Sequence, residues 1–265
     1  MITKQDIDLY IDRVPQTSKI LIKTLKLLNE GELTLAARVA ENDLSLNAYL
    51  TNLINKPIYG LKNRVNNIPQ IFGILGIDAT QQTLYNYMIN LLSPKEWKFF
   101  KLNITTFNNL QAELSTNWKK ILIHLKIEDK NIESAIALLP SSIIVAEAIF
   151  KNHIENINAI RMVQDIDLNT ILKRLSGLDL FDICEKITLK WDMPQVVAQL
   201  IQSSSGTKPS SNREIDTLAK WMHLLLFYTL SKKQFVESQL NDFIDFQIDY
   251  VDDIYSDFAI LMDIS

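Results

Sequence analysis

Residues 42–76 read NDLSLNAYLTNLINKPIYGLKNRVNNIPQIFGILG, and this stretch decides the expected fold. Apolar residues recur at helical spacing until residues 55–60, Asn-Lys-Pro-Ile-Tyr-Gly, interrupt the pattern. Pro57 has no N–H to donate and disfavours helical backbone at the residue before it, and the glycine three residues later can adopt a positive φ. The stretch therefore predicts a helix, a sharp corner followed by the basic residue Arg64, and a second helix that ends at Gly76.

The composition restricts the class of protein that the chain can form. Of its 265 residues, 47% are hydrophobic and 22% are charged, which supplies enough apolar material for a buried core. The net charge of −4 leaves no overall basic field to attract nucleic acid or anionic lipid. A single cysteine, Cys184, excludes an internal disulfide and fits a reducing compartment. The N-terminal residues carry acids and no apolar signal region, so we expect a cytoplasmic protein.

Helical periodicity extends over the whole chain. Six glycines and seven prolines separate segments whose apolar residues repeat at helical spacing, and strand-type alternation is scarce. We therefore predict an all-α fold. The most apolar run, residues 143–150, is interrupted by Glu147, so no membrane-spanning helix is expected.

Three local features are predicted for the second half of the chain. Pro94 is expected to open a short helix that contains Phe99 and Phe100. The serine-rich residues 203–212 are typical of a mobile surface loop. The last segment predicts a helix with an apolar face (Phe243, Phe246, Tyr250, Ile254, Phe258, Leu261) and an acidic face (Asp242, Asp245, Asp249, Asp252, Asp253, Asp257). The acidic face is either a solvated surface or a stripe that binds a partner.

A second motif, Leu-Lys-Trp-Asp-Met-Pro, occupies residues 189–194. Together with the first stretch, it resembles the HDOD domain, a catalytically degenerate relative of the HD phosphohydrolases found in bacterial signalling proteins. That family typically shows Asn-Ser-x-x-Tyr-Gly, a closing Leu-Gly, and Leu-x-x-Trp-x-Leu-Pro, for which Met193 here replaces the last leucine. The residues that match these motifs are Asn55, Tyr59, Gly60, Gly76, Trp191 and Pro194. Trp191 is expected to anchor the core.

The resemblance implies two helical lobes and a C-terminal extension. We expect an N-terminal lobe over residues 1–92, a degenerate HD-like lobe over residues 93–205, and a loop with a helical extension over residues 206–265.

The positions that would bind metal in an active HD enzyme carry other residues here. The resemblance places Pro140 and Ser141 where the His-Asp pair would stand, Lys120 in place of an upstream histidine, and Ser203 and Ser204 in place of a downstream histidine pair. A divalent metal that activates water needs imidazole and carboxylate ligands, which none of these side chains supplies. We therefore predict no metal, no cofactor and no catalytic residue.

The remaining candidates for chemistry do not rebuild such a site. His124 and His223 lie in apolar-rich segments and His153 lies near a helix end, so all three are expected to be structural or surface residues. Cys184 is expected to be a buried free thiol. No P-loop, G-x-G-x-x-G or G-x-S-x-G motif is present.

These observations lead to a functional hypothesis and two alternatives. We predict a non-enzymatic bacterial signalling module that binds another protein through the corner at residues 55–64, beside Arg64, or through the turn at residues 191–194. The first alternative is a metal-dependent phosphohydrolase or nucleotide-binding protein with unrecognised ligands. The second is nucleic-acid binding through a basic stripe, but a solvated helix face explains that stripe better. The stripe consists of Lys19, Lys23 and Lys26.

Overall fold

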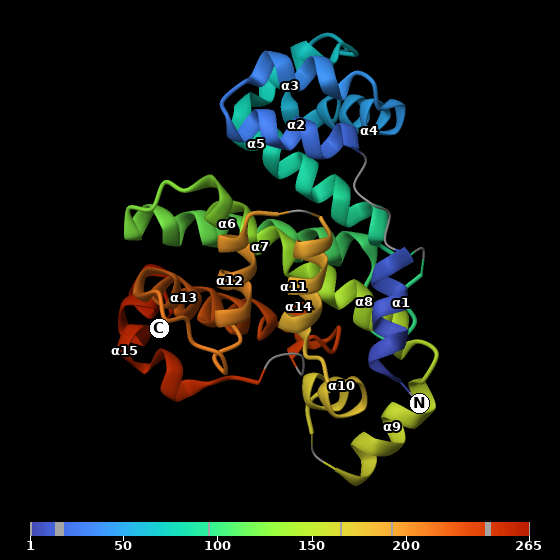
Figure 1. Cartoon of the computed structure of the whole chain (residues 1–265), viewed down its shortest axis with the longest axis vertical. Coiled ribbons are helices and arrows are strands. Elements are labelled where there is room, and N and C mark those ends of the chain that lie inside the picture. Colours follow the sequence, from blue (N-terminus) through green and yellow to red (C-terminus); the bar gives the residue numbers. More distant parts are fainter. Residues whose placement is uncertain are drawn as a thin grey trace. The chain divides into compact units, whose positions relative to one another are not determined.

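The computed structural model describes residues 2–13, 19–94, 96–164, 166–191, 193–241 and 245–264. All regular secondary structure within these ranges is helical, which confirms the predicted all-α class (Figure 1). The chain divides into two compact units, a smaller one of Pro15–Leu92 and a larger one that combines Met1–Val14 with Ser93–Ser265.

The smaller unit is built from four α-helices and one 3₁₀ helix within its described residues, and small side chains on α3 allow close packing. Its elements are α2 (Lys19–Asn29), α3 (Leu33–Ala40), α4 (Leu44–Ile54), the short 3₁₀ helix η1 (Pro57–Tyr59) and α5 (Ile68–Leu92). Ala36, Ala37 and Ala40 are fully buried on α3, which packs against both α2 and α5. Asp43 caps α4, because its side chain accepts hydrogen bonds from two backbone N–H groups of the first turn.

The helix expected to end at Gly76 instead continues through a kink. Gly76 has φ 73° and ψ 178° inside α5, a conformation that side chains with a Cβ rarely adopt. The hydroxyl of Thr80 donates to the carbonyl of Gly76 at 2.6 Å. The stop predicted at this glycine is therefore present as a local break between two helical segments.

The larger unit surrounds a buried helical pair. Its elements are α1 (Lys4–Arg13), α6 (Ile104–Leu125), α7 (Lys130–Leu138), α8 (Pro140–Phe150), α9 (Ile154–Val163), α10 (Leu168–Ser176), α11 (Leu180–Lys190), α12 (Gln195–Ser203), α13 (Arg213–Leu230), α14 (Lys233–Val236) and α15 (Ile248–Leu261). Every residue of α8 is buried. It is enclosed by α1 and α11, while α6 and α12 cover α7.

The first helix belongs to the larger unit. The lobe expected from the sequence ran from residue 1 to residue 92, whereas the compact smaller unit begins at Pro15. Helix α1 packs against α8, α10 and α11. Lys186 forms an ion pair with Asp8 at 2.9 Å, and the Lys190 ammonium donates to the carbonyl of Ile11.

One stretch, Lys130–Phe150, is long and apolar enough to cross a membrane by length and composition, although no such span was expected. Within the structure, 94% of its most apolar window is buried. The apolar side chains of this stretch are therefore buried against the other helices of the larger unit.

The short helix predicted after Pro94 is absent from the described residues of this segment. In place of helical hydrogen bonds, the backbone N–H groups of Lys98, Phe99 and Phe100 donate to the carboxylate of Glu147, at 2.6, 3.1 and 2.9 Å. Glu147 lies on α8 and is completely buried. Hydrogen bonds from backbone N–H groups to a carboxylate are stronger than those between neutral groups, so this long-range contact replaces the local helix.

Two predictions for the C-terminal part are corrected. The serine-rich segment begins in the core, because Ser203, Ser204 and Ser205 are buried. The last helix begins at Ile248, so Phe246 precedes it. The predicted members Asp242 and Phe243 lie outside the described residues.

Candidate functional site

The corner after α4 is held together by the side chain of Asn55. Its amide nitrogen donates to the carbonyls of Thr51 and Val65, each at 2.7 Å. Its amide oxygen accepts from the N–H of Val65 at 2.9 Å. The Asn55 amide therefore closes the loop by pairing with both the N–H and the carbonyl of Val65, as a neighbouring strand would.

Within the corner, Pro57 and Gly60 perform the roles expected from their chemistry. Pro57 opens the 3₁₀ turn, where a missing N–H costs nothing. Gly60 has φ 62° and ψ 20°, and its N–H donates to the carbonyl of Pro57 at 3.0 Å. Tyr59 is half-buried, whereas Arg64 is exposed. The loop therefore presents a basic surface on a fixed backbone, to which Lys56 and Lys62 also contribute.

The second motif lies at the junction of α11 and α12. Trp191 is buried and ends α11, with its N–H donating to the carbonyl of Ile187 at 2.9 Å. Pro194 directly precedes α12. The N–H of Met193 donates to the carbonyl of Thr188 at 3.1 Å, which fixes the turn. The indole is therefore placed to pack the core and not to present a surface, and Asp192 lies outside the described residues.

Three of the positions equivalent to HD metal ligands, Ser141, Ser204 and Lys120, carry side chains with partners in the structure. The hydroxyl of Ser141 donates to the carbonyl of Leu138 at 2.5 Å, and that of Ser204 to Ile201 at 2.7 Å. Ser203 is buried at the end of α12. Lys120 is separate from them on α6, 3.7 Å from the carboxylate of Asp263.

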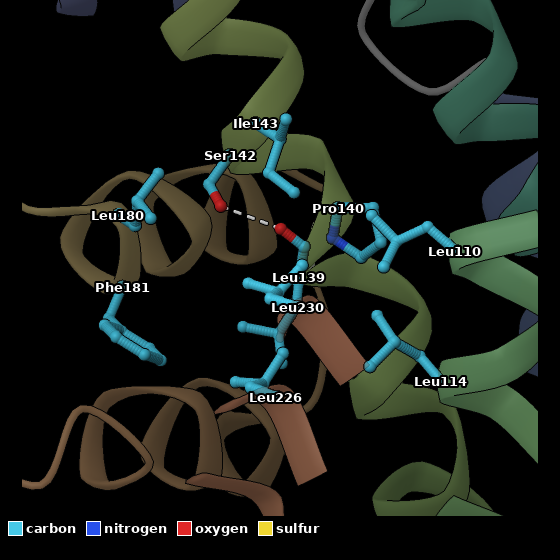
Figure 2. Close-up of a pocket in the computed structure, with 10 residues that line it drawn as sticks. All are labelled: Leu110, Leu114, Leu139, Pro140, Ser142, Ile143, Leu180, Phe181, Leu226 and Leu230. Carbon is cyan, nitrogen blue, oxygen red and sulfur yellow. Dashed lines mark hydrogen bonds between the residues drawn. The ribbon is translucent and has the colours of Figure 1, made fainter. Parts of the chain in front are cut away.

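The space beside Pro140 is an apolar cavity of about 30 Å³ (Figure 2). Aliphatic and aromatic side chains from α6, α8, α11 and α13 point into it, and the hydroxyl of Ser142 donates to the carbonyl of Leu139 at 2.7 Å. The lining residues are Leu110, Leu114, Leu139, Pro140, Ser142, Ile143, Leu180, Phe181, Leu226 and Leu230. Divalent metals require oxygen, nitrogen or sulfur ligands, so these walls do not fit a metal. Among the described residues, no three His, Cys, Asp or Glu side chains form a group able to hold one.

Cys184 lies on α11 in the same core. Its thiol donates to the carbonyl of Leu138 at 3.3 Å, and burial raises its pKa to about 12. Because only the thiolate is a strong nucleophile or metal ligand, this cysteine is unreactive at neutral pH.

The three histidines have separate surroundings. His124 is exposed, with its ring 5.5 Å from that of Trp221. His153 lines a groove of about 430 Å³ between the start of the chain and α9. His223 is completely buried and bonded through both ring nitrogens. The sequence predicted neither these bonds nor the bonds from the N–H groups of residues 98–100 to Glu147, here termed the Glu147 cradle. The partners lie 19 to 49 residues apart in the chain.

A family model for the HDOD domain matches residues 14–206. The chain belongs to the HDOD family. Its fold is similar to the crystal structure of an HDOD domain protein of unknown function from Geobacter sulfurreducens, with a TM-score of 0.62 and 13% sequence identity. No curated protein matches the chain.

The structural similarity extends beyond the HDOD match. The alignment with the Geobacter sulfurreducens protein covers 97% of this chain and 95% of the other, whereas the family model stops at residue 206. Helices α13 and α15 therefore belong to an arrangement that this solved HDOD protein shares.

Proposed function

We propose that this HDOD protein is a non-catalytic signalling module of the bacterial cytoplasm that acts by binding another protein. The observation that carries the proposal is the chemistry around Pro140. Where the resemblance to HD enzymes implies a metal centre, the chain has an apolar cavity and serine hydroxyls that are bonded to their own helix backbone. Such walls can pack but cannot activate water.

The corner at residues 55–64 is the surface that we propose for the partner. Asn55 and Gly60 fix its backbone, so little conformational freedom is lost when a partner binds. Its exposed basic side chains favour an acidic face on the partner.

The experiment combines a chemical assay with quantitative capture. The purified protein is analysed for metal content and for hydrolysis of cyclic dinucleotides and a generic phosphodiester. In parallel, proteins that cross-link to wild-type chain in the source cytosol are compared with those captured by Arg64→Ala and by Arg38→Ala, a matched exposed arginine on α3.

The proposal predicts a partner that Arg64→Ala loses and Arg38→Ala retains, with stability unchanged within about 0.5 kcal/mol. A stoichiometric metal together with phosphodiester hydrolysis would instead establish the enzyme alternative. Equal capture by both variants would remove the corner as the binding surface.

A further inference from the structure

Residues 245–264, here termed the C-terminal strap, follow α13 and α14 in the sequence and lie near the C-terminus. The strap contains α15, which packs on α13 (Figure 1). Its apolar anchors are Val251 and Phe258, both almost completely buried. The ring of Phe258 lies 5.9 Å from that of Trp221 on α13.

His223 joins the strap to the end of α12. The N–H of Gln247, in the strap, donates to Nε2 of His223 at 3.1 Å. Since Nε2 accepts, Nδ1 carries the proton and donates to the carbonyl of Ser204 at 2.9 Å. The bonds therefore require a neutral imidazole with one defined tautomer, which bridges two segments of backbone.

The strap approaches the Ser204 segment closely around this imidazole. A Cβ placed on Gly206 would lie 2.9 Å from Cβ of Gln247, so the two backbones are in tight contact. The ring of His223 stacks on Phe246 at 5.7 Å and meets the edge of Tyr250 at 6.0 Å. The imidazole is thus enclosed by strap residues.

Other polar and charged side chains from the strap and from α13 surround this joint. The strap contributes the exposed Asp245 and the Tyr250 hydroxyl, which donates to Asp216 of α13 at 3.1 Å. Lys220 of α13 pairs with Asp253 of the strap at 2.8 Å. Imidazole is the side chain whose charge ordinarily changes between pH 5 and 8, so His223 is the group of this joint suited to respond to pH in this range. Burial lowers its pKa, consistent with the neutral form.

We propose that the strap is a proton-operated latch, in which protonation of His223 at Nε2 removes the acceptor for the Gln247 N–H and loosens residues 245–264 from α13. The imidazolium takes its proton from solvent. Its new Nε2–H then faces the N–H of Gln247, so two donors oppose each other. Opening restores water to the imidazole and exposes the aromatic side chains of Trp221 and Phe258. The helices around α8 remain folded in this process.

Hydrogen exchange on the full-length protein tests the latch. Amide exchange is measured from pH 7.5 to pH 5, corrected for the intrinsic pH dependence, and His223 is titrated by NMR. The strap opening constant is expected to rise by up to about tenfold per pH unit below pH 6.5, as for uptake of one proton, while α8 and α11 stay protected. A strap that stays protected while His223 titrates, or that opens only together with α8, would overturn the proposal.

A pair of variants assigns the effect to this imidazole. His223→Gln places a non-titrating acceptor near Gln247, so its strap exchange should lose the pH response. His124→Gln alters an exposed histidine beside the same Trp221 and should keep the response. An unchanged response in His223→Gln contradicts the latch. If that variant does not fold, the wild-type titration decides by itself.

Discussion

Asn55 satisfies both backbone hydrogen-bonding groups of Val65, ten residues further along the chain. Its oxygen accepts from the Val65 N–H at 2.9 Å and its nitrogen donates to the Val65 carbonyl at 2.7 Å. A serine or alanine could not span this distance with both a donor and an acceptor. The asparagine of the family motif is therefore the residue that closes the corner.

Replacing Asn55 by alanine should destabilise the smaller unit by about 1–3 kcal/mol, because two backbone groups of Val65 lose their partners. Chemical denaturation together with amide exchange at Val65 measures this. Asn52→Ala, an exposed asparagine on the same helix, should change stability by less than about 0.5 kcal/mol. Equal effects of the two variants would show that the bonds to Val65 contribute nothing.

Gly60→Val should cost about 1–3 kcal/mol, since its left-handed φ of 62° strains a β-branched residue. A Cβ there meets no atom within 4 Å, so the cost is conformational and not steric crowding. Gly60→Asn should lose less, because asparagine tolerates this region. Gly73→Ala, in regular helix with open space around it, should be neutral or stabilising. Equal melting temperatures for Gly60→Val and wild type would refute this description of the turn.

Glu147→Gln should destabilise the larger unit by about 1–3 kcal/mol. The variant keeps the shape but turns an NH₂ group toward backbone N–H donors of Lys98, Phe99 and Phe100. Denaturation in urea measures the loss, with the exposed Glu155→Gln as control. Equal urea midpoints of unfolding for the two variants would show that the bonds from residues 98–100 to Glu147 do not stabilise the unit.

Cys184 should resist thiol reagents at pH 8 in the folded protein and react rapidly after denaturation. Its pKa of about 12 leaves about one thiol in ten thousand ionised at that pH. An unfolded thiol ionises above about pH 8.5, whereas the folded thiol stays neutral. Ionisation therefore favours the unfolded state, and the contribution of Cys184 to the free energy of unfolding falls as pH rises. Fast modification under native conditions would show that the thiol is accessible.

The sequence predicted those parts of the molecule that depend on neighbours in the chain. The all-α class, the corner at Gly60 and the break at Gly76 follow from proline and glycine chemistry within a few residues. The helix predicted after Pro94 failed because the buried carboxylate of Glu147, 47 to 49 residues away, binds the same N–H groups. The serine-rich loop was partly wrong for a similar reason, since His223 holds the Ser204 carbonyl. Long-range partners of this kind leave no periodic signal.

The buried pair α7 and α8 also sets an order of events during synthesis. Its coverings α11 and α12 are completed only at Ser203, about 50 residues after the pair has ended at Phe150. At ribosomal speeds this gap lasts about 3–10 s. During that interval only α1 and α6 are available to cover this apolar segment, so the faces that pack against α11 and α12 stay exposed. Native packing of this unit therefore waits for translation of its second half.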